Sequence, residues 1–207
     1  MKFDFEDDNY VNKWTRDPEL YWYEKTVVDN FFDKTGTVLV VGCGTGRDSV
    51  PLARMGYDVS ALDISRKMVY TGRKLYRHEK KIHFCAGSGT RLPFADESFN
   101  HCILSCQTIN LIDDLHVGIT GGHRVLKDGG IFTFTMHNPC SINALLLRDQ
   151  MLNFRLYSPI KMERELRVSG FKEITINSLR TFNKPTSLLS KYPFVLFHHL
   201  LIYVCRK

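Results

Sequence analysis

The segment with the strongest structural signal reads Val38-Leu39-Val40-Val41-Gly42-Cys43-Gly44-Thr45-Gly46. Its first half, extended back to Thr37, is a continuous β-branched and aliphatic run, which is typical of a strand buried on both faces. Glycines follow at once, and the residues from Asp48 to Met55 then predict a helix. A buried strand that passes through glycines into a helix is the opening of a βαβ unit.

The same alternation of strands and helices continues along the chain. Further strands are predicted at Tyr57–Leu62, Ile82–Cys85, Phe99–Ser105, Ile131–Met136, Phe171–Asn177 and Leu200–Cys205. Further helices are predicted at Ser65–Lys74, Asp113–Leu126 and Pro159–Ser169 and across residues 7–32, and Lys127–Gly130 predicts a turn. The pattern predicts an α/β fold: a doubly wound, Rossmann-like, seven-stranded, mostly parallel sheet with helices on both faces. Because no clear helix separates the last two strands, we expect the last strand to be antiparallel.

A carboxylate complements the glycine segment. Asp63 ends the second predicted strand, about 20 residues after Gly42. Open α/β sheets bind ligands in the crevice beyond the carboxyl ends of their strands, where glycines let the backbone approach a ligand closely. A carboxylate in that crevice can accept hydrogen bonds from both ribose hydroxyls of a nucleoside.

The glycine spacing distinguishes between classes of nucleotide. A dinucleotide fingerprint requires a glycine at position 47, where this chain has Arg47. A P-loop requires lysine and then serine or threonine after its last glycine, but Gly46 is followed by Arg47 and Asp48. A nucleoside with a small zwitterionic tail therefore fits the segment better than a pyrophosphate does.

Together with three further motifs, this segment resembles the class I S-adenosylmethionine (SAM)-dependent methyltransferases, close to their small-molecule, ubiquinone/menaquinone-biosynthesis-like branch. The resemblance covers about Thr37 to Phe171. The further motifs are Ala61-Leu62-Asp63-Ile64-Ser65 with Met68, Arg91-Leu92-Pro93-Phe94-Ala95-Asp96-Glu97-Ser98-Phe99-Asn100, and Arg124-Val125-Leu126-Lys127-Asp128-Gly129-Gly130. The resemblance implies an enzyme that transfers a methyl group from SAM to a small or medium-sized, partly apolar acceptor and leaves S-adenosylhomocysteine.

The resemblance also implies the cofactor residues and no metal. These residues are Gly42, Cys43, Gly44, Gly46, Asp63, Ile64, Met68, Ser88, Gly89 and Ser105. The glycine segment would contact the methionine part of SAM, and Asp63 would hold the ribose. Ile64 and Met68 would enclose the adenine, and Ser88 and Gly89 would meet its edge. The Ser105 carbonyl would face the methionine amino group.

Two positions depart from the family pattern. An acid usually stands two residues before the first glycine, where this chain has Val40, and an aspartate usually stands at Ser88. Both changes remove a negative charge near the cofactor, and serine can still accept a hydrogen bond from adenine. From the N-terminal segment, Tyr10 and Trp14 are expected either to close over the cofactor or to pack in an aromatic core.

Methyl transfer needs alignment and the exclusion of water more than a fixed catalytic motif, because the donor carries the reactivity. His137, after the fifth predicted strand, is the first candidate for a catalytic base. His116 ranks lower because it falls within a predicted helix, and His198-His199 are interpreted as structural. Gln107 and Asn110 are candidates for orienting the acceptor or, equally, for capping and loop bonding.

Two nucleic-acid chemistries are disfavoured by position. Amino-methylating DNA and RNA enzymes carry Asp/Asn-Pro-Pro-Tyr/Phe after the fourth strand, where this chain reads Ser105-Cys106-Gln107-Thr108. Pro139-Cys140-Ser141 resembles the nucleophile motif of cytosine-C5 RNA methyltransferases, in which the cysteine follows the fourth strand. Cys140 follows the fifth predicted strand instead, so it is disfavoured as a nucleophile. Cys106 is nearer the required place but lacks a flanking proline.

The length suits one domain that covers residues 1–207. We divide it into an N-terminal helical cap (1–36), a cofactor-binding core (37–137), a possible lid or acceptor insert (138–158), and a C-terminal helix with edge strands (159–207). The apolar run Ala144–Leu147 within the insert is expected to line an acceptor pocket or to form helix core.

Composition limits the partners and the location. The chain is 43% hydrophobic and 24% charged and has a net charge of +6. Its densest basic stretch, Arg73–Lys81, is interpreted as a solvated helix face, so nucleic acid is possible but not favoured. No apolar run spans a membrane and no signal peptide is visible, so a cytoplasmic location is expected. The oligomeric state stays open.

Three alternative functions stay open. One is an RNA or protein methyltransferase that uses the basic surface, and another is a non-catalytic SAM-binding module, which Val40 and Ser88 make credible. The third is a nicotinamide-dependent oxidoreductase, against which Arg47 counts.

The six cysteines show no zinc-ligand spacing and are interpreted as reduced thiols.

Overall fold

The computed structural model describes residues 4–141, 153–178 and 200–207. They build a seven-stranded sheet in the order β3-β2-β1-β4-β5-β7-β6. The strands are β1 (Thr37–Val41), β2 (Asp58–Asp63), β3 (Ile82–Ala86), β4 (Phe99–Leu104), β5 (Leu126–His137), β6 (Glu173–Ser178) and β7 (Leu200–Arg206). The pairs from β3 to β5 are parallel, whereas β7 is antiparallel to both β5 and β6. The predicted fold class, with its antiparallel last strand, is confirmed.

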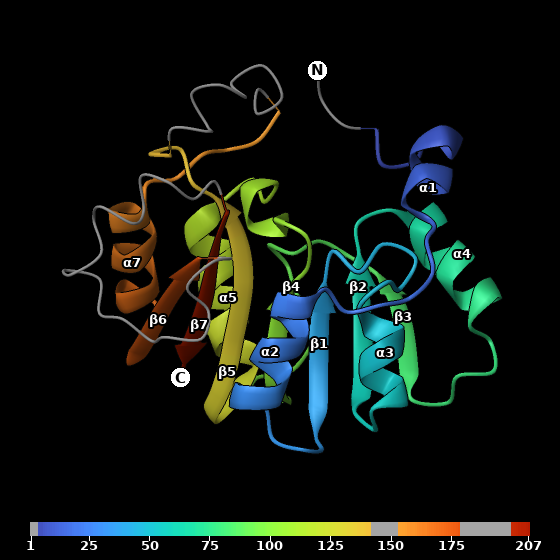
Figure 1. Cartoon of the computed structure of the whole chain (residues 1–207), viewed down its shortest axis with the longest axis horizontal. Coiled ribbons are helices and arrows are strands. Elements are labelled where there is room, and N and C mark those ends of the chain that lie inside the picture. Colours follow the sequence, from blue (N-terminus) through green and yellow to red (C-terminus); the bar gives the residue numbers. More distant parts are fainter. Residues whose placement is uncertain (1–3, 142–152, 179–199) are drawn as a thin grey trace.

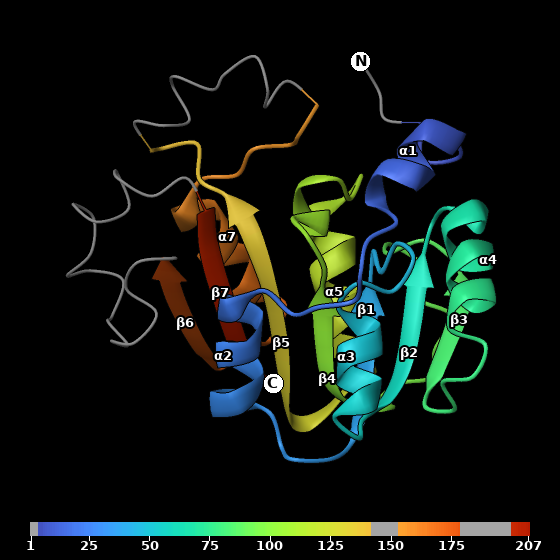
Figure 2. The ribbon, with the colours of Figure 1, turned by 45° about the vertical axis from the view of Figure 1, so that its right-hand side comes forward.

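Helices cover both faces of the sheet. They are α1 (Asp8–Trp14), α2 (Trp22–Phe31), α3 (Ser49–Arg54), α4 (Arg66–Leu75), α5 (Leu115–Val125), α7 (Pro159–Val168) and the short helix η1 (Thr108–Asn110). Figures 1 and 2 show α2 and α3 on one face and α5 and α7 on the other. Sequence-encoded caps begin several helices; the Ser65 hydroxyl, for example, accepts a hydrogen bond from Met68 N at the start of α4 (3.1 Å).

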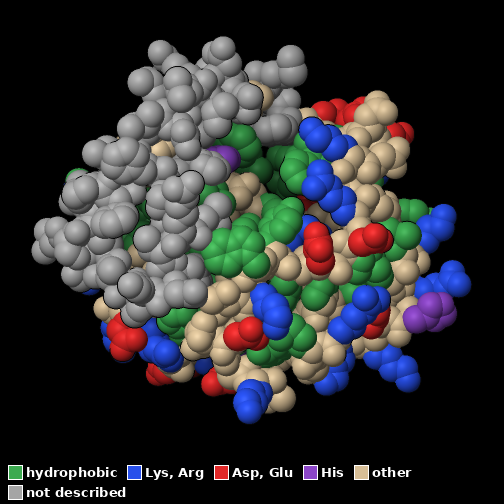
Figure 3. All heavy atoms as spheres, in the orientation of Figure 1, with side chains coloured by type: hydrophobic (Ala, Val, Ile, Leu, Met, Phe, Trp, Pro, Cys, Tyr) green, Lys and Arg blue, Asp and Glu red, His purple; other side chains and the backbone are tan. Residues whose placement is uncertain are grey.

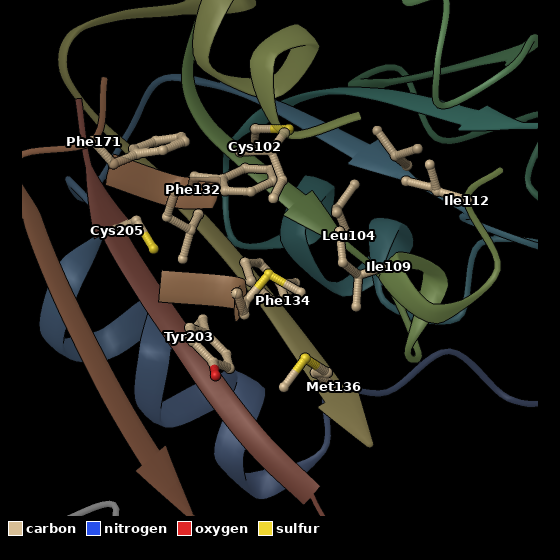
Figure 4. Close-up of a cluster of buried hydrophobic side chains, with 14 of the residues drawn as sticks. Cys102, Leu104, Ile109, Ile112, Phe132, Phe134, Met136, Phe171, Tyr203 and Cys205 are labelled. Atoms are coloured by element: carbon tan, nitrogen blue, oxygen red, sulfur yellow. The ribbon is translucent and has the colours of Figure 1, made fainter. Parts of the chain in front are cut away.

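A hydrophobic core lies on each face. On the side of α5 and α7, Phe132 stacks on Phe171 (5.2 Å between ring centres) and Phe134 stacks on Tyr203 (4.8 Å), as Figure 4 shows. Stacked pairs of this kind contribute about 0.5–1.5 kcal/mol each beyond their buried area. Since Phe134 is also the strand partner of Tyr203, the stack helps to fix the register of β5 against β7. On the other side, Val38 and Val40 of β1 pack beneath α2 and α3.

The parallel strands bring the functional residues to one edge. Val41, the last residue of β1, is level with Leu62 of β2 and with Leu104 of β4. The residues that follow these strands therefore meet at the same edge, and α1 lies above it in Figures 1 and 2. The N-terminal segment is attached there, because the Glu6 carboxylate accepts hydrogen bonds from Arg66 N (2.7 Å) and Lys67 N (3.3 Å) at the start of α4.

The structure corrects one predicted turn. Residues Lys127–Gly130 lie within β5, which already begins at Leu126 opposite Phe99. Between Phe99 and His101 the register against β5 shifts, and Gly129 takes a positive φ of 75°. The glycines therefore form an irregularity inside the strand, as in a β-bulge, rather than a break before it.

Some predictions fall outside the described residues. Ala144–Leu147 and His198-His199 lie there, as does most of the proposed 138–158 insert. Within the described ranges, no helix combines the length and the apolar character needed to cross a bilayer.

Candidate active site

A cavity of about 240 Å³ opens at the edge where β1, β2 and β4 end. All the predicted cofactor residues except Gly46 line it. Tyr10 and Trp14 of α1 line it as well, so this end of the cap lies against the same space as the glycine segment. Residues from the first strand, the second strand and the cap therefore meet around one cavity.

The glycines of the segment have different physical roles. Gly42, Gly44 and Gly46 have positive φ values of 75°, 54° and 105°, which side chains rarely adopt. A Cβ atom on Gly42 would lie 2.1 Å from the Thr108 hydroxyl, and one on Gly46 would lie 2.8 Å from the Phe84 ring. A Cβ on Gly44 would meet nothing within 4 Å. Gly42 and Gly46 thus permit close packing, whereas Gly44 leaves cavity space free for a ligand.

The Asp63 carboxylate lies beside this open glycine. Only 9% of the residue is exposed, and its two oxygens accept hydrogen bonds from Gly44 N (2.8 Å) and Ser65 N (2.9 Å). Burial raises the pKa of Asp63 above its usual value, although the hydrogen bonds from Ser65 and Gly44 oppose the rise. Each carboxylate oxygen still has a lone pair for a ligand hydroxyl, because each uses only one here.

Comparison with known proteins identifies the family. Residues 39–134 match the family described as a methyltransferase domain. A demethylmenaquinone methyltransferase of Paenarthrobacter aurescens (strain TC1) is 38% identical over 109 residues, which are 52% of this chain and 42% of that protein. These matches show a methyltransferase domain in residues 39–134, as the resemblance to the class I SAM-dependent methyltransferases implies. The chain spans less than half the length of this relative.

Two further similarities support the fold across more of the chain. The O-methyltransferase cnsE of Penicillium expansum is 28% identical over 161 residues, which are 73% of this chain and 58% of that protein. Phosphoethanolamine N-methyltransferase 2 of Haemonchus contortus, solved in complex with SAM, superimposes with a TM-score of 0.74. That comparison covers 99% of this chain and 60% of the other at 17% identity, so it shows the shared fold.

The residues around the cavity suit SAM. A buried carboxylate is available for ribose hydroxyls, and the free space above Gly44 admits a ligand close to the backbone. Met68 is buried whereas Ile64 is 60% exposed, and both present apolar surface at the cavity where an adenine could lie. The Ser88 hydroxyl contacts the Thr90 hydroxyl (2.9 Å) and remains at the cavity wall.

The turn after β4 has an unusual backbone that sequence reasoning missed. Cys106 and Gln107 both have positive φ values, 40° and 57°, and both line the cavity. Such conformations cost about 1–2 kcal/mol per residue outside glycine, and they concentrate at functional sites. The turn is held by the Ser105 carbonyl, which accepts hydrogen bonds from Thr108 N (2.8 Å) and from the Thr108 hydroxyl.

Arg47 joins this turn to α2 of the N-terminal cap, a contact that the sequence did not predict. Its guanidinium makes two hydrogen bonds to the Glu24 carboxylate of α2 (2.7 and 2.8 Å) and stacks on Tyr21 (4.2 Å to the ring centre). It also donates to Cys106 Sγ (3.3 Å). Burial opposes the charge of Arg47, but the hydrogen bonds to Glu24 and the charge of Asp48 outweigh it, so the pKa of Arg47 is raised.

The candidate base His137 lies behind the cavity wall. It ends β5, and its ring packs edge-on against Phe154 (4.8 Å between ring centres), which lines the cavity. His137 itself does not line the cavity. Asn110 accepts from His137 N (3.0 Å) and donates to the Arg155 carbonyl (2.6 Å), so it bonds loops rather than facing the cavity.

The remaining candidate residues differ in whether they line the cavity. Gln107 lines the cavity and donates from its side chain to the Thr135 hydroxyl (3.2 Å). His116 is exposed on α5 and contacts Glu165 of α7 (3.2 Å), away from the cavity. Cys140 is exposed and does not line the cavity, whereas Cys106 does.

Proposed function

We propose that this chain transfers the methyl group of SAM to a small or medium-sized, partly apolar acceptor. The proposal rests above all on one observation: the buried Asp63 carboxylate is fixed beside Gly44, where the cavity has room for a ligand. A buried charge that two backbone N–H groups hold in place is pre-organised for hydroxyl donors. Among the described residues, no other donor occupies the remaining lone pairs of the Asp63 carboxylate.

In this proposal each cofactor residue has a defined part. Gly42, Cys43 and Gly44 contact the methionine moiety through their backbone, and Gly46 permits the turn. Asp63 accepts from the ribose hydroxyls. The adenine lies between Ile64 and Met68, with its edge at Ser88 and Gly89. Ser105 faces the methionine amino group with its carbonyl, which accepts from Thr108 N and the Thr108 hydroxyl. Because a carbonyl oxygen has two lone pairs, the amino group would take the place of the Thr108 hydroxyl.

The chain's contribution to the chemistry is positioning. Bound SAM supplies a methyl group made electrophilic by a positively charged sulfur. Tyr10 and Trp14 cover the cavity from the cap, so they keep water from the reacting atoms. Gln107 offers a polar side chain after β4 for orienting an acceptor, and its hydrogen bond to Thr135 limits its rotation.

The apolar part of the acceptor would pack on Trp14, Leu111 and Phe154, which line the cavity. The assignment of His137 as a general base stays a prediction. Phe154 would have to move before the imidazole of His137 could reach the cavity. We also propose a cytoplasmic location, which agrees with six cysteines that are all free.

Calorimetry with SAM and S-adenosylhomocysteine tests the proposal, followed by a screen of phenol, quinol, amine and carboxylic acid acceptors. Binding of both nucleosides with turnover of at least one acceptor is expected. Binding without turnover on any acceptor would favour the non-catalytic module. Methylation of tRNA or protein, with binding that weakens steeply as salt rises, would favour the macromolecular alternative.

A further inference from the structure

Among the described residues that line the cavity, one cationic side chain has no carboxylate partner. Among the described residues, the charged side chains that line it are Arg16, Arg47, Asp63 and Asp113. Arg47 is bound by Glu24, and Asp113 accepts from Arg155 (2.8 Å). Within the described part of the chain, no carboxylate pairs with Arg16, whose Nε reaches only the Lys13 carbonyl at 3.5 Å.

Arg16 is nevertheless held in place at the cavity. Its guanidinium lies over the Trp14 ring at 5.3 Å from the centre, and Tyr10 lies on the same indole at 6.1 Å. A cation stacked on an aromatic face keeps its N–H groups free at the edge of its plane for hydrogen bonding. Figure 3 shows basic side chains next to hydrophobic ones on the face beside α1.

Charge balance adds a second argument, which rests on the methyl-transfer function proposed above. Bound SAM carries a net positive charge, and Asp63 would be occupied by its ribose. An acceptor in the same cavity would then share it with a cationic sulfur and with the Arg16 guanidinium, which has no carboxylate partner among the described residues. An anion there is attracted by both, whereas a cationic acceptor is repelled by both.

We infer that the methyl acceptor carries an anionic oxyacid group, a carboxylate or a phosphate, that pairs with Arg16. Its apolar body packs against Trp14 and Phe154, which line the same cavity. The planar guanidinium can bind two oxygens of either anion at once. Arg16 thus determines specificity for an amphipathic acid rather than for a neutral or cationic acceptor.

Binding to the S-adenosylhomocysteine-loaded protein tests this without requiring turnover. The calorimetric probes are 4-hydroxybenzoate, phenyl phosphate and the neutral methyl ester of 4-hydroxybenzoate. We expect at least one anion to bind about fivefold more tightly than the ester, which is the upper range for a bidentate pair at the exposed Arg16 side chain. Arg16→Gln should remove this preference, while Arg164→Gln, an equal loss of charge on α7 outside the cavity, should preserve it. The tighter anion shows which oxyacid fits.

Each outcome decides one question. Equal binding of anions and ester by the wild type, a preference that survives in Arg16→Gln, or no binding of any probe would overturn the inference. Those results would leave the proposed function intact as long as S-adenosylhomocysteine binds. Failure of the nucleoside itself to bind would instead refute the proposed function, and the inference would fall with it.

Discussion

Replacing Asp63 with asparagine tests the cofactor site with a nearly isosteric change. Each hydrogen bond from a ribose hydroxyl to an ionised carboxylate contributes about 1.5–3 kcal/mol. Asparagine keeps one acceptor oxygen and places an NH₂ group where the other oxygen accepts from Gly44 or Ser65. We therefore expect a loss of about 2 kcal/mol in nucleoside binding, which is roughly a 30-fold higher Kd.

The same substitution should affect folding much less, because two effects oppose each other. One backbone N–H loses its acceptor, but a buried charge is also removed. Since burial raises the pKa of Asp63 in the folded protein, its ionisation disfavours folding as the pH rises through that raised pKa. At neutral pH the carboxylate therefore costs stability, and Asp63→Asn should leave Tm near or above that of the wild type.

The raised pKa also gives the site a pH signature. Nucleoside binding requires the ionised carboxylate, so affinity should fall as the pH drops through the raised pKa of Asp63, above the ordinary 3.8. Asp63→Asn should lack this dependence.

Calorimetric titration with S-adenosylhomocysteine across a pH series measures both effects, and thermal unfolding reports the stability. The matched control is Asp113→Asn, since that acid also lines the cavity but is 79% exposed and paired with Arg155. The reasoning fails if folded Asp63→Asn binds as tightly as the wild type, or if both asparagine variants weaken binding equally.

Three further predictions follow from other parts of the site. Gly42→Ala should destabilise the fold by about 2 kcal/mol or more, because its Cβ would collide with the Thr108 hydroxyl. Gly44→Ala should stay folded and lose nucleoside affinity, because its Cβ would enter free cavity space. Thermal unfolding and calorimetry distinguish the two variants, and equal Tm values would contradict the prediction. Arg47→Met should cost about 3 kcal/mol in chemical denaturation, because it leaves the largely buried Glu24 carboxylate without its cation. Adding Glu24→Gln should recover much of this loss, and no recovery would count against the pair. His137→Asn should lower kcat with little change in nucleoside affinity, and an unchanged pH profile of kcat would remove His137 as the base.

The central fold could be predicted because its signals are local. The buried run of β1 begins and ends where predicted, at Thr37 and Val41. An apolar run that ends in glycines can be recognised from neighbouring residues alone. The start of α4 was predicted at Ser65 for the same reason, because the serine that caps a helix is next to it in the sequence. The predicted turn at Lys127–Gly130 was wrong because glycines inside a strand resemble glycines between elements, and only the pairing with β4 distinguishes them.

The missed features depend on residues far apart in the sequence. Arg47 was interpreted only as the absence of a glycine, whereas its bonds to Glu24 and Cys106 join α2 to the turn after β4. The positive φ values of Cys106 and Gln107 have no sequence signal, since neither residue type favours them. Such strain is maintained by surrounding contacts, and those contacts exist only in the folded chain.

The departures from the family pattern gain a common physical meaning from the cavity. Val40 is fully buried beneath α2 and α3, where an acid would have to be desolvated among apolar side chains. Val40 does not line the cavity and Ser88 is neutral, so Asp63 and Asp113 are the acids among the described residues that line it. A further acid about 10 Å from a bound anion would repel it by about 1.7 kcal/mol at an effective dielectric constant of about 20. On the proposed function, the missing acids would make cofactor binding depend more heavily on Asp63, and they would lower the electrostatic cost of an acidic acceptor beside Arg16.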